Sequence, residues 1–204
     1  MTIAAPSSRL TRYRQPTGFF TVNFPDNWRA IQAPGAFAAT ITPPAGLVTL
    51  ANGQQTIAYG VVINHYYPFD GESARWDASM SAHYAPFERT VPPRGALEDA
   101  TDDLIRSILR ANGYLTATPG SAKPETIDGV AAYSAMLSGI SPLTGEEEQV
   151  KVYTRMLPDD HVLFALCVAP TRDFSVLERT FGRIMQSLVV NEDVVHGIAG
   201  SGRR

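Results

Sequence analysis

The chain has 204 residues, and with 44% hydrophobic and 18% charged residues it can build the core of one domain. Its net charge of −3 gives no electrostatic reason to expect a nucleic acid or an anionic membrane as partner. The single cysteine, Cys167, excludes an intrachain disulfide and a zinc site built from cysteines.

The sequence shows no pattern typical of a secretory signal or a membrane span. The first residues lack the apolar core of about 7–15 residues that defines a secretory signal. No stretch approaches the roughly 20 apolar residues of a membrane span, so we expect no direct insertion into a membrane. The protein is expected to be cytoplasmic if the chain is complete, and periplasmic or otherwise extracytoplasmic if it is a fragment of a membrane-linked protein.

The N-terminal part of the chain predicts strands rather than helices. Residues 1–17 are rich in Ser, Arg and Pro and are expected to form a linker or arm. Residues 19–24 alternate with a period of two, which is typical of a strand, and Trp28 beyond the following turn is expected to anchor the core. Residues 37–42 and 57–66 predict two further strands, the second rich in β-branched and aromatic residues.

Residues 67–94 fit neither the helical nor the strand period and contain four prolines. A loop of this length inside a compact domain is either functional or mobile. Its aromatic residues are candidates for contact with a partner, because exposed aromatic side chains often anchor interfaces. Three alternatives remain open: rings exposed for binding, rings folded over the edge of the core, or disorder. The candidate partner-binding residues are Tyr66, Tyr67, Trp76, Tyr84 and Phe87.

Residues 97–111 predict an amphipathic helix. Its apolar stripe has helical spacing, its carboxylates come early and its arginines late, and Asn112-Gly113 supplies a stop. Asp102 and Arg106 are spaced as an i,i+4 ion pair. The stripe consists of Leu104, Ile105, Ile108 and Leu109.

Residues 130–190 predict three strands and a helix, and a further short strand precedes them. Residues 124–127 and 130–138 are expected to pair as a hairpin around Asp128-Gly129, a favoured turn sequence. Residues 149–157 alternate as the next strand. Residues 162–169 are apolar on both faces, as in a central strand that is covered on each side.

A second helix is expected over residues 173–188, because five apolar residues fall on one of its faces. Ser175 and Glu178 have the spacing of a capping box at its start. The apolar face consists of Phe174, Leu177, Phe181, Ile184 and Leu188.

Together these elements predict an α+β fold with one antiparallel sheet of about six strands sandwiched between helices on opposite faces. The sheet is expected to include the strands near 19–24, 57–66, 130–138, 149–157 and 162–169. We expect a single monomeric domain over residues 18–191, with a long loop at 67–95 and a flexible tail at 192–204.

Catalytic and metal-binding patterns are not found. Gly71 to Arg75 begins like the nucleophile elbow of a serine hydrolase, but Arg75 replaces the closing glycine, so Ser73 is expected to be a loop serine. Cys167 lies within an apolar strand, where a thiol is normally inert. We therefore expect no enzyme activity, no catalytic residue and no cofactor.

The four histidines are His65, His83, His161 and His196, and none is spaced i,i+4 with another. His65 and His83 flank the long loop, where Asp70 or Glu72 could complete a metal site, but ordinary loop histidines are favoured. No metal is expected.

Three segments resemble a known family: residues 19–28 (FFTVNFPDNW), 137–154 (LSGISPLTGEEEQVKVYT) and 164–188 (FALCVAPTRDFSVLERTFGRIMQSL). They resemble the PsbP-like domain of the extrinsic photosystem II protein and of a Ran-binding nuclear import factor. This resemblance implies an antiparallel sheet between helices, an α/β/α sandwich.

The closest resemblance is to the accessory domain that follows the peptidase in bacterial membrane-linked zinc metallopeptidases of the HExxH kind. There, a Pro-Ser-Ser-Arg lead-in like residues 6–9 precedes the first strand. The resemblance covers residues 6–66 and 96–191, and residues 67–94 are longer than the usual connection. The chain lacks the peptidase half, so no catalytic or zinc residue carries over.

The sequence therefore predicts a non-catalytic accessory or protein-binding module with a protein or peptide partner. The resemblance adds that it could be the detached C-terminal domain of a zinc metallopeptidase. The alternative is a small-ligand or metal-binding domain that uses the loop at 67–94.

Overall fold

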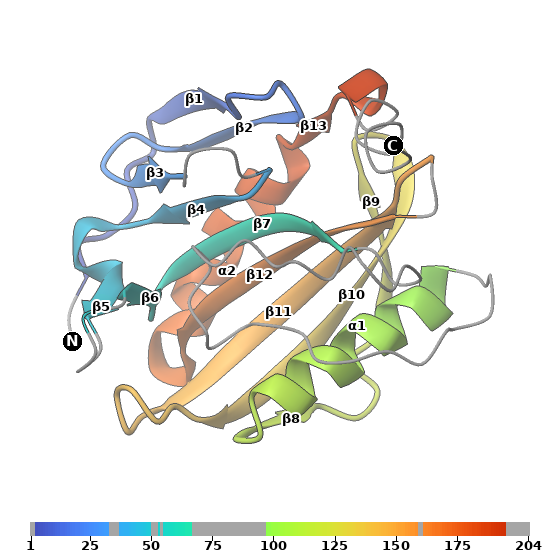
Figure 1. Cartoon of the computed structure of the whole chain (residues 1–204). Helices are drawn as coiled ribbons and strands as arrows, with labels where there is room; N and C mark the ends of the chain where they lie inside the picture. The colour runs from blue at the N-terminus through green and yellow to red at the C-terminus, as the bar shows by residue number, and fades with distance from the viewer. Residues whose placement is uncertain are drawn as a thin grey trace.

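The computed structural model of the chain describes residues 3–32, 37–49, 53, 55–66, 97–158 and 161–194, without the side chains of Gln55 and Tyr66. Within these residues an eight-stranded sheet, here called the main sheet, occupies the centre (Figure 1). Its order is β3-β4-β7-β12-β11-β10-β8, with β9 also paired to β10. The strands are β3 (Arg29–Ile31), β4 (Ala39–Thr42), β7 (Gly60–Tyr66), β8 (Leu115–Ala117), β9 (Lys123–Ile127), β10 (Val130–Ile140), β11 (Glu147–Met156) and β12 (Val162–Pro170).

Two smaller sheets accompany the main sheet. The first, here called the N-terminal sheet, has the order β1-β2-β13 and lies at the top of Figure 1. It consists of β1 (Leu10–Arg14), β2 (Phe20–Pro25) and β13 (Val189–Val190). The second consists of β5 (Leu47–Thr49) and β6 (Gln55–Ile57), preceded by the 3₁₀ turn η1 (Pro44–Gly46). All strand pairs in the three sheets are antiparallel.

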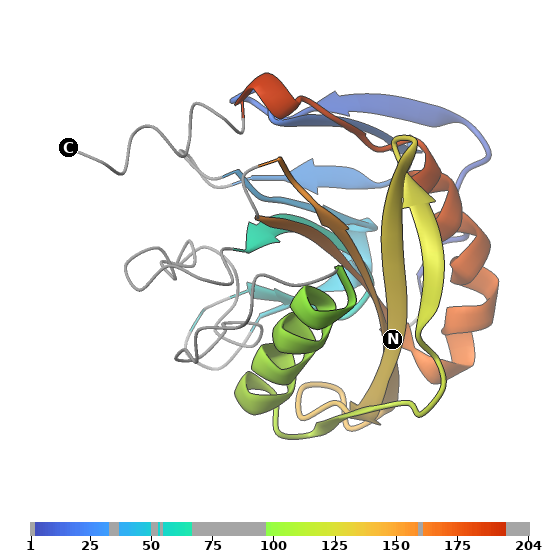
Figure 2. The same cartoon turned by 90° about the vertical axis from the view of Figure 1, so that its right-hand side faces the viewer.

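The two long helices lie on opposite faces of the main sheet, as predicted (Figure 2). Helix α1 (Leu97–Ala111) packs Leu104 and Ile108 on one face, and α2 (Thr171–Gln186) packs Phe181 and its neighbours on the other. In the described part of the chain, no helix has the length and apolar character needed to cross a membrane.

Strand β12 is buried along its whole length, which confirms the prediction of a central strand covered on both sides. Leu163, Ala165 and Cys167 belong to the core on the α2 side. Phe164 and Leu166 belong to the core on the α1 side. The alternation of a strand thus divides one apolar run between two cores.

The turn of the β9–β10 hairpin and the end of α1 form where the local sequence predicts them. Asp128 and Gly129 have φ values of 53° and 74°, the left-handed pair that a two-residue hairpin turn requires. Asn112 directly follows α1, and its side-chain amide donates to the carbonyl oxygen of Ile108 at 2.9 Å. The bounds of α1 are those predicted.

Three local predictions are wrong. The capping box fails because α2 begins at Thr171, directly after Pro170, so that Ser175 lies inside the helix. The expected Asp102–Arg106 side-chain pair is replaced by a bond from Arg106 Nε–H to the main-chain carbonyl oxygen of Asp102 at 3.2 Å. Residues 1–17 contain a strand, β1, where a linker was expected.

Strand β2 does not join the main sheet, contrary to prediction. It pairs with β1 on one side and with β13 on the other. Phe20, Val22 and Phe24 are buried in the core on the α2 side, so this strand packs as an additional layer over that core. The period of two predicted the strand, but its partners come from opposite ends of the chain.

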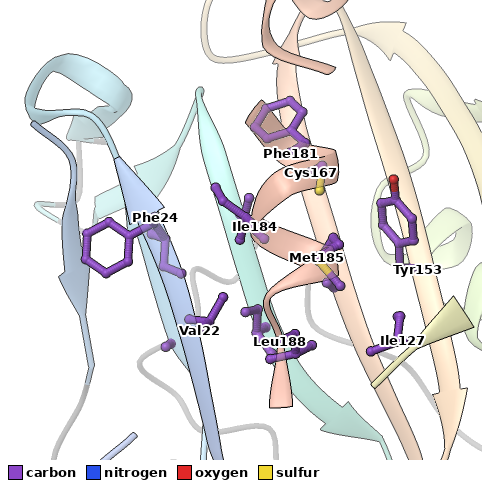
Figure 3. Packing of buried hydrophobic residues seen from close by; sticks show 14 of the residues in the cluster. Val22, Phe24, Ile127, Tyr153, Cys167, Phe181, Ile184, Met185 and Leu188 are labelled. Atoms are coloured by element: carbon purple, nitrogen blue, oxygen red, sulfur yellow. The ribbon is translucent and has the colours of Figure 1, made fainter. Parts of the chain in front are cut away.

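The core on the α2 side provides a direct test of the fold. Phe181 is 1% exposed, and its ring centroid lies 6.4 Å from that of Trp28 and 5.7 Å from that of Phe174. Figure 3 shows Phe181 with Ile184 and Met185 among side chains of the main sheet and the N-terminal sheet.

Replacing Phe181 with Ala should lower the free energy of unfolding by about 3–5 kcal/mol, because it opens a cavity in this core. Denaturant unfolding measures the change. The control is Val176→Ala on the same helix, since Val176 is 72% exposed and its truncation should cost less than about 0.5 kcal/mol. Equal losses in the two variants would contradict the packing of α2.

Candidate functional site

Most of the sequence-predicted site residues lie outside the described residues. Tyr66 ends β7 and its backbone pairs with Val162, but its side chain is not described. A contact between these aromatic residues and a partner therefore stays a prediction. The residues outside are Tyr67, Trp76, Tyr84 and Phe87, together with Asp70, Glu72, Ser73, His83 and His196.

Two of the four histidines meet at the end of the main sheet where β7 ends. The ring centroids of His65 and His161 are 6.1 Å apart, and His65 also meets the rings of Phe19 and Phe37 at 5.7 and 5.5 Å. Burial lowers the pKa of His65 to about 4. Burial, and then the charge of His65, lowers the pKa of His161 to about 3. Both imidazoles are therefore neutral at pH 7, and His65 packs with the rings of Phe19 and Phe37.

The described residues contain no group of three or more His, Cys, Asp or Glu that could hold a metal ion. Cys167 is fully buried, and burial raises the pKa of its thiol far above the ordinary value. It is held as a neutral thiol within the core.

Several polar side chains join separate elements of the fold. The Tyr114 hydroxyl donates to Glu148 at 2.6 Å, and the Tyr59 hydroxyl donates to Asp173 at 2.7 Å. Lys151 lies 3.6 Å from a carboxylate oxygen of Glu125 and 4.9 Å from the centre of the Tyr153 ring. These contacts join the segment after α1 to β11, the start of α2 to the segment before β7, and β9 to β11.

Arg155 is the most deeply buried charged side chain of the core, at 1% exposed. Its guanidinium forms an ion pair with Glu192 and lies 3.5 Å from a carboxylate oxygen of Asp128. The Asp128 carboxylate also accepts the main-chain N–H of Val190 at 2.9 Å. Arg155 therefore links β11, the β9–β10 turn and the chain around β13. Because β13 pairs with β2, this cluster also fixes the N-terminal sheet.

Removing the negative charges of the cluster should destabilise the protein. Asp128→Asn keeps the left-handed turn, which Asn tolerates, and Glu192→Gln keeps the shape of the second side chain. Together they leave a buried guanidinium without a counter-charge, and we expect the free energy of unfolding to fall by about 3 kcal/mol. Chemical denaturation measures the loss.

The control is Asp26→Asn at the exposed Arg9–Asp26 pair, whose loss should cost less than about 1 kcal/mol. A double variant as stable as wild type would show that Arg155 does not depend on its carboxylates.

A groove of about 660 Å³ lies on the N-terminal sheet and combines main-chain, apolar and cationic groups. Its lining residues are Arg12, Arg14, Gly18, Phe20, Thr21, Val189, Val190 and Asn191.

The alternation of the strands explains which side chains reach this groove. On β1, Tyr13 points inward, with its hydroxyl donating to Gln32 at 3.0 Å, so Arg12 and Arg14 point outward. Arg14 and Val189 both stand opposite Thr21, one on each side of β2. Arg12 donates to the Thr21 hydroxyl oxygen at 3.3 Å.

The turn between β1 and β2 closes one end of the groove. Gly18 has a φ of +82°, a conformation that favours glycine, and its N–H donates to the carbonyl oxygen of Gln15 at 2.8 Å. A side chain here would be strained, so the turn keeps its glycine beside Arg14.

Positive and negative side chains are distributed unevenly along the sequence, which the net charge of the whole chain does not show. Residues 1–25 contain Arg9, Arg12 and Arg14 and no acidic residue, so a total of −3 leaves −6 for the rest of the chain. Arg9 pairs with Asp26 at 3.6 Å. Among the described residues, no carboxylate forms an ion pair with Arg12 or Arg14. The outer face of the N-terminal sheet is therefore cationic on an otherwise acidic protein.

Sequence reasoning missed this site because residues 1–17 were expected to form an arm. The available signal was the alternation of Leu10, Arg12 and Arg14 with Thr11 and Tyr13, together with the absence of acidic residues up to position 25.

The arrangement of strands and helices matches that of a solved protein. The solution structure of the cyanobacterial PsbP of Synechocystis, CyanoP, gives a TM-score of 0.51 at 12% identity. The match covers 94% of this chain and 96% of that one. The chain has a PsbP-like fold. The fold implied by the sequence resemblance is therefore confirmed, whereas a link to metallopeptidases stays a prediction.

Two further solved structures are similar with lower TM-scores. A protein of Bacteroides thetaiotaomicron gives 0.47 at 10% identity, covering 88% of this chain and 48% of that one. LpqN of Mycobacterium tuberculosis, a protein involved in cell envelope biogenesis, gives 0.45 at 14% identity, covering 90% and 91%. No family model and no curated protein match this chain.

Proposed function

We propose that the chain is a non-catalytic accessory domain that binds a protein or peptide partner on the outer face of the N-terminal sheet. The observation that carries this proposal is the pair of arginines, Arg12 and Arg14, in a groove without a carboxylate partner among the described residues.

The composition of this face suits a protein interface. Arginine is enriched at interfaces because its planar guanidinium binds carboxylates through two hydrogen bonds while its stem covers apolar surface. Apolar side chains lie beside the arginines: Leu10 is 37% exposed and Val189 is 49% exposed. A partner could therefore bury apolar area and neutralise charge on the same face.

The face is also held in place before any partner arrives. Asn23 N–H donates to the Ser187 hydroxyl oxygen at 2.9 Å, and Asn191 N–H donates to the carbonyl oxygen of Phe19 at 2.8 Å. These bonds and the Arg155 cluster join the sheet to the end of α2. A preformed surface reduces the conformational entropy lost on binding.

The aromatic residues Tyr66, Tyr67, Trp76, Tyr84 and Phe87 are proposed as a second contact, on the basis of the sequence alone. The sequence resemblance further supports an origin as the C-terminal domain of a membrane-linked zinc metallopeptidase. An HExxH segment upstream in the same reading frame would support this origin, and a frame that starts at the present Met1 would oppose it.

The proposed binding can be tested by capture from an extract of the source cell. Immobilised wild-type protein should retain a partner, and Arg14→Glu should retain at least tenfold less of it, because the substitution reverses a charge in the groove. Quantitative mass spectrometry measures the recovered protein.

The matched control is Arg179→Glu, which changes the net charge equally at an exposed position on α2. Equal recovery by the three proteins would contradict binding at this face, and recovery of no protein by wild type would contradict the accessory role.

A further inference from the structure

We infer that the free edge of β1 accepts an extended acidic segment of the partner as an additional strand. This inference rests on the proposed function and specifies the chemistry and the conformation of what is bound.

Strand β1 is one of the two edge strands of the N-terminal sheet. Within the described part of the chain it pairs with β2 alone. Four of its five residues are exposed, and Tyr13 alone is partly buried. The edge is therefore accessible over the length of the strand.

The pairing register decides which main-chain groups of β1 point away from β2. Asp26 N–H donates to the carbonyl oxygen of Arg9 at 3.0 Å, and Gln15 N–H donates to that of Phe20 at 2.9 Å. In an antiparallel pair, residues bonded to the partner strand alternate with residues whose N–H and C=O point outward. Arg9 and Gln15, which flank the two ends of β1, are bonded on the β2 side. The main-chain N–H and C=O groups of Leu10, Arg12 and Arg14 therefore point away from β2.

Strand β9 is also an edge strand, but its outward edge is protected against pairing with a further strand. Ile127 and Val130 flank the two-residue turn and pair directly. By the same alternation, Pro124 and Thr126 point outward on β9. Pro124 has no N–H to offer, and proline at such a position is a common protection of a sheet edge. The edge of β1 carries no such block.

The side chains of β1 specify the charge of the added strand. A strand paired with the outer edge places its residues opposite Leu10, Arg12 and Arg14, with their side chains on the same outer face. Acidic residues opposite the two arginines form ion pairs there, and an apolar residue covers Leu10. The preferred antiparallel segment therefore has the order acidic, any, acidic, any, apolar.

The same side chains disfavour a second copy of this chain as the added strand. Antiparallel pairing of β1 with another β1 about its centre places Arg12 opposite Arg12. Like charges directly opposite each other destabilise a pair of strands. An acidic segment of a different protein is the occupant that the charges favour.

The test uses the labelled heptapeptide Thr-Glu-Thr-Glu-Thr-Val-Thr and the full chain, with fluorescence anisotropy at low salt. Wild type should bind it at least tenfold more tightly than Thr-Lys-Thr-Lys-Thr-Val-Thr. Arg12→Pro removes both the outward N–H and the charge, and should weaken binding at least fivefold more than Arg12→Ala, which removes the charge alone. Arg179→Ala should leave the affinity unchanged.

Methylated peptides test strand pairing without altering the protein. Methylation of the two Glu amides, which would face β1, should abolish binding, whereas methylation of the two central Thr amides, which would face away, should preserve it. Equal binding of both methylated peptides, or equal binding by Arg12→Pro and Arg12→Ala, would overturn strand addition. Displacement of the peptide by short polyphosphate with these amide effects absent would assign the face to anions in general.

The two failures are distinguishable. If no acidic peptide binds while cellular capture still depends on Arg14, strand addition is wrong and the accessory function stands. If capture shows no dependence on Arg14 while the methylation pattern is as expected, the edge is competent for pairing and the accessory function is wrong.

Discussion

The burial of β12 on both faces is the constraint on which the rest of the structure depends. Its nine residues are all buried, so both faces of the main sheet must be covered at β12. An antiparallel sheet can otherwise leave one face exposed to solvent. Helix α1 covers one face, and α2, which starts immediately after β12, covers the other. The chain leaves α2 at the edge of its core and continues into β13, which supplies a partner for β2. The position of the N-terminal sheet thus follows from the need to cover β12.

Buried polar contacts then determine how the N-terminal sheet is oriented. Arg155 stands on the α2 side of β11 and joins carboxylates from two separate segments, Asp128 and Glu192. Burying the Arg155 guanidinium is costly and the two partly exposed carboxylates offset this cost, so the cluster contributes the arrangement that it specifies rather than net stability. With the bond between Asn23 and Ser187, it keeps the outer face of β1 and β2 fixed with respect to the main sheet. The cationic groove is therefore a consequence of the fold and not of a separate loop.

Local sequence predicted the elements well and their partners less well. The bounds of α1, the Asp128-Gly129 hairpin and the two-sided burial of β12 all depend on patterns within about fifteen residues, which a sequence displays directly. The pairing of β2 with β13 joins positions far apart in the chain, and the period of two within a strand does not predict such a partner. Strand β1 was missed because its outward arginines give it the composition of a linker.

The predicted site residues and the site proposed from the structure differ for a physical reason. Aromatic rings are visible in a sequence as candidate anchors, whereas an edge strand becomes visible only when the sheet order is known. Strand alternation places Arg155 on the same face of β11 as Lys151 and Tyr153. Its ion pairs with Asp128 and Glu192 join separate segments, which no sequence pattern could bring together. The sequence pattern also could not bring together His65 and His161, whose ring centroids lie 6.1 Å apart.

Amide hydrogen exchange of the full chain tests the central claim most directly. If the two-sided cover of β12 organises the fold, the amides of Leu163 to Val168 should exchange only through global unfolding and be the slowest in the protein. The outward amides of Leu10, Arg12 and Arg14 should exchange fastest among those of the strands. Exchange in β12 as fast as in β1 would contradict the claim, because it would mean that β12 opens without loss of the surrounding layers.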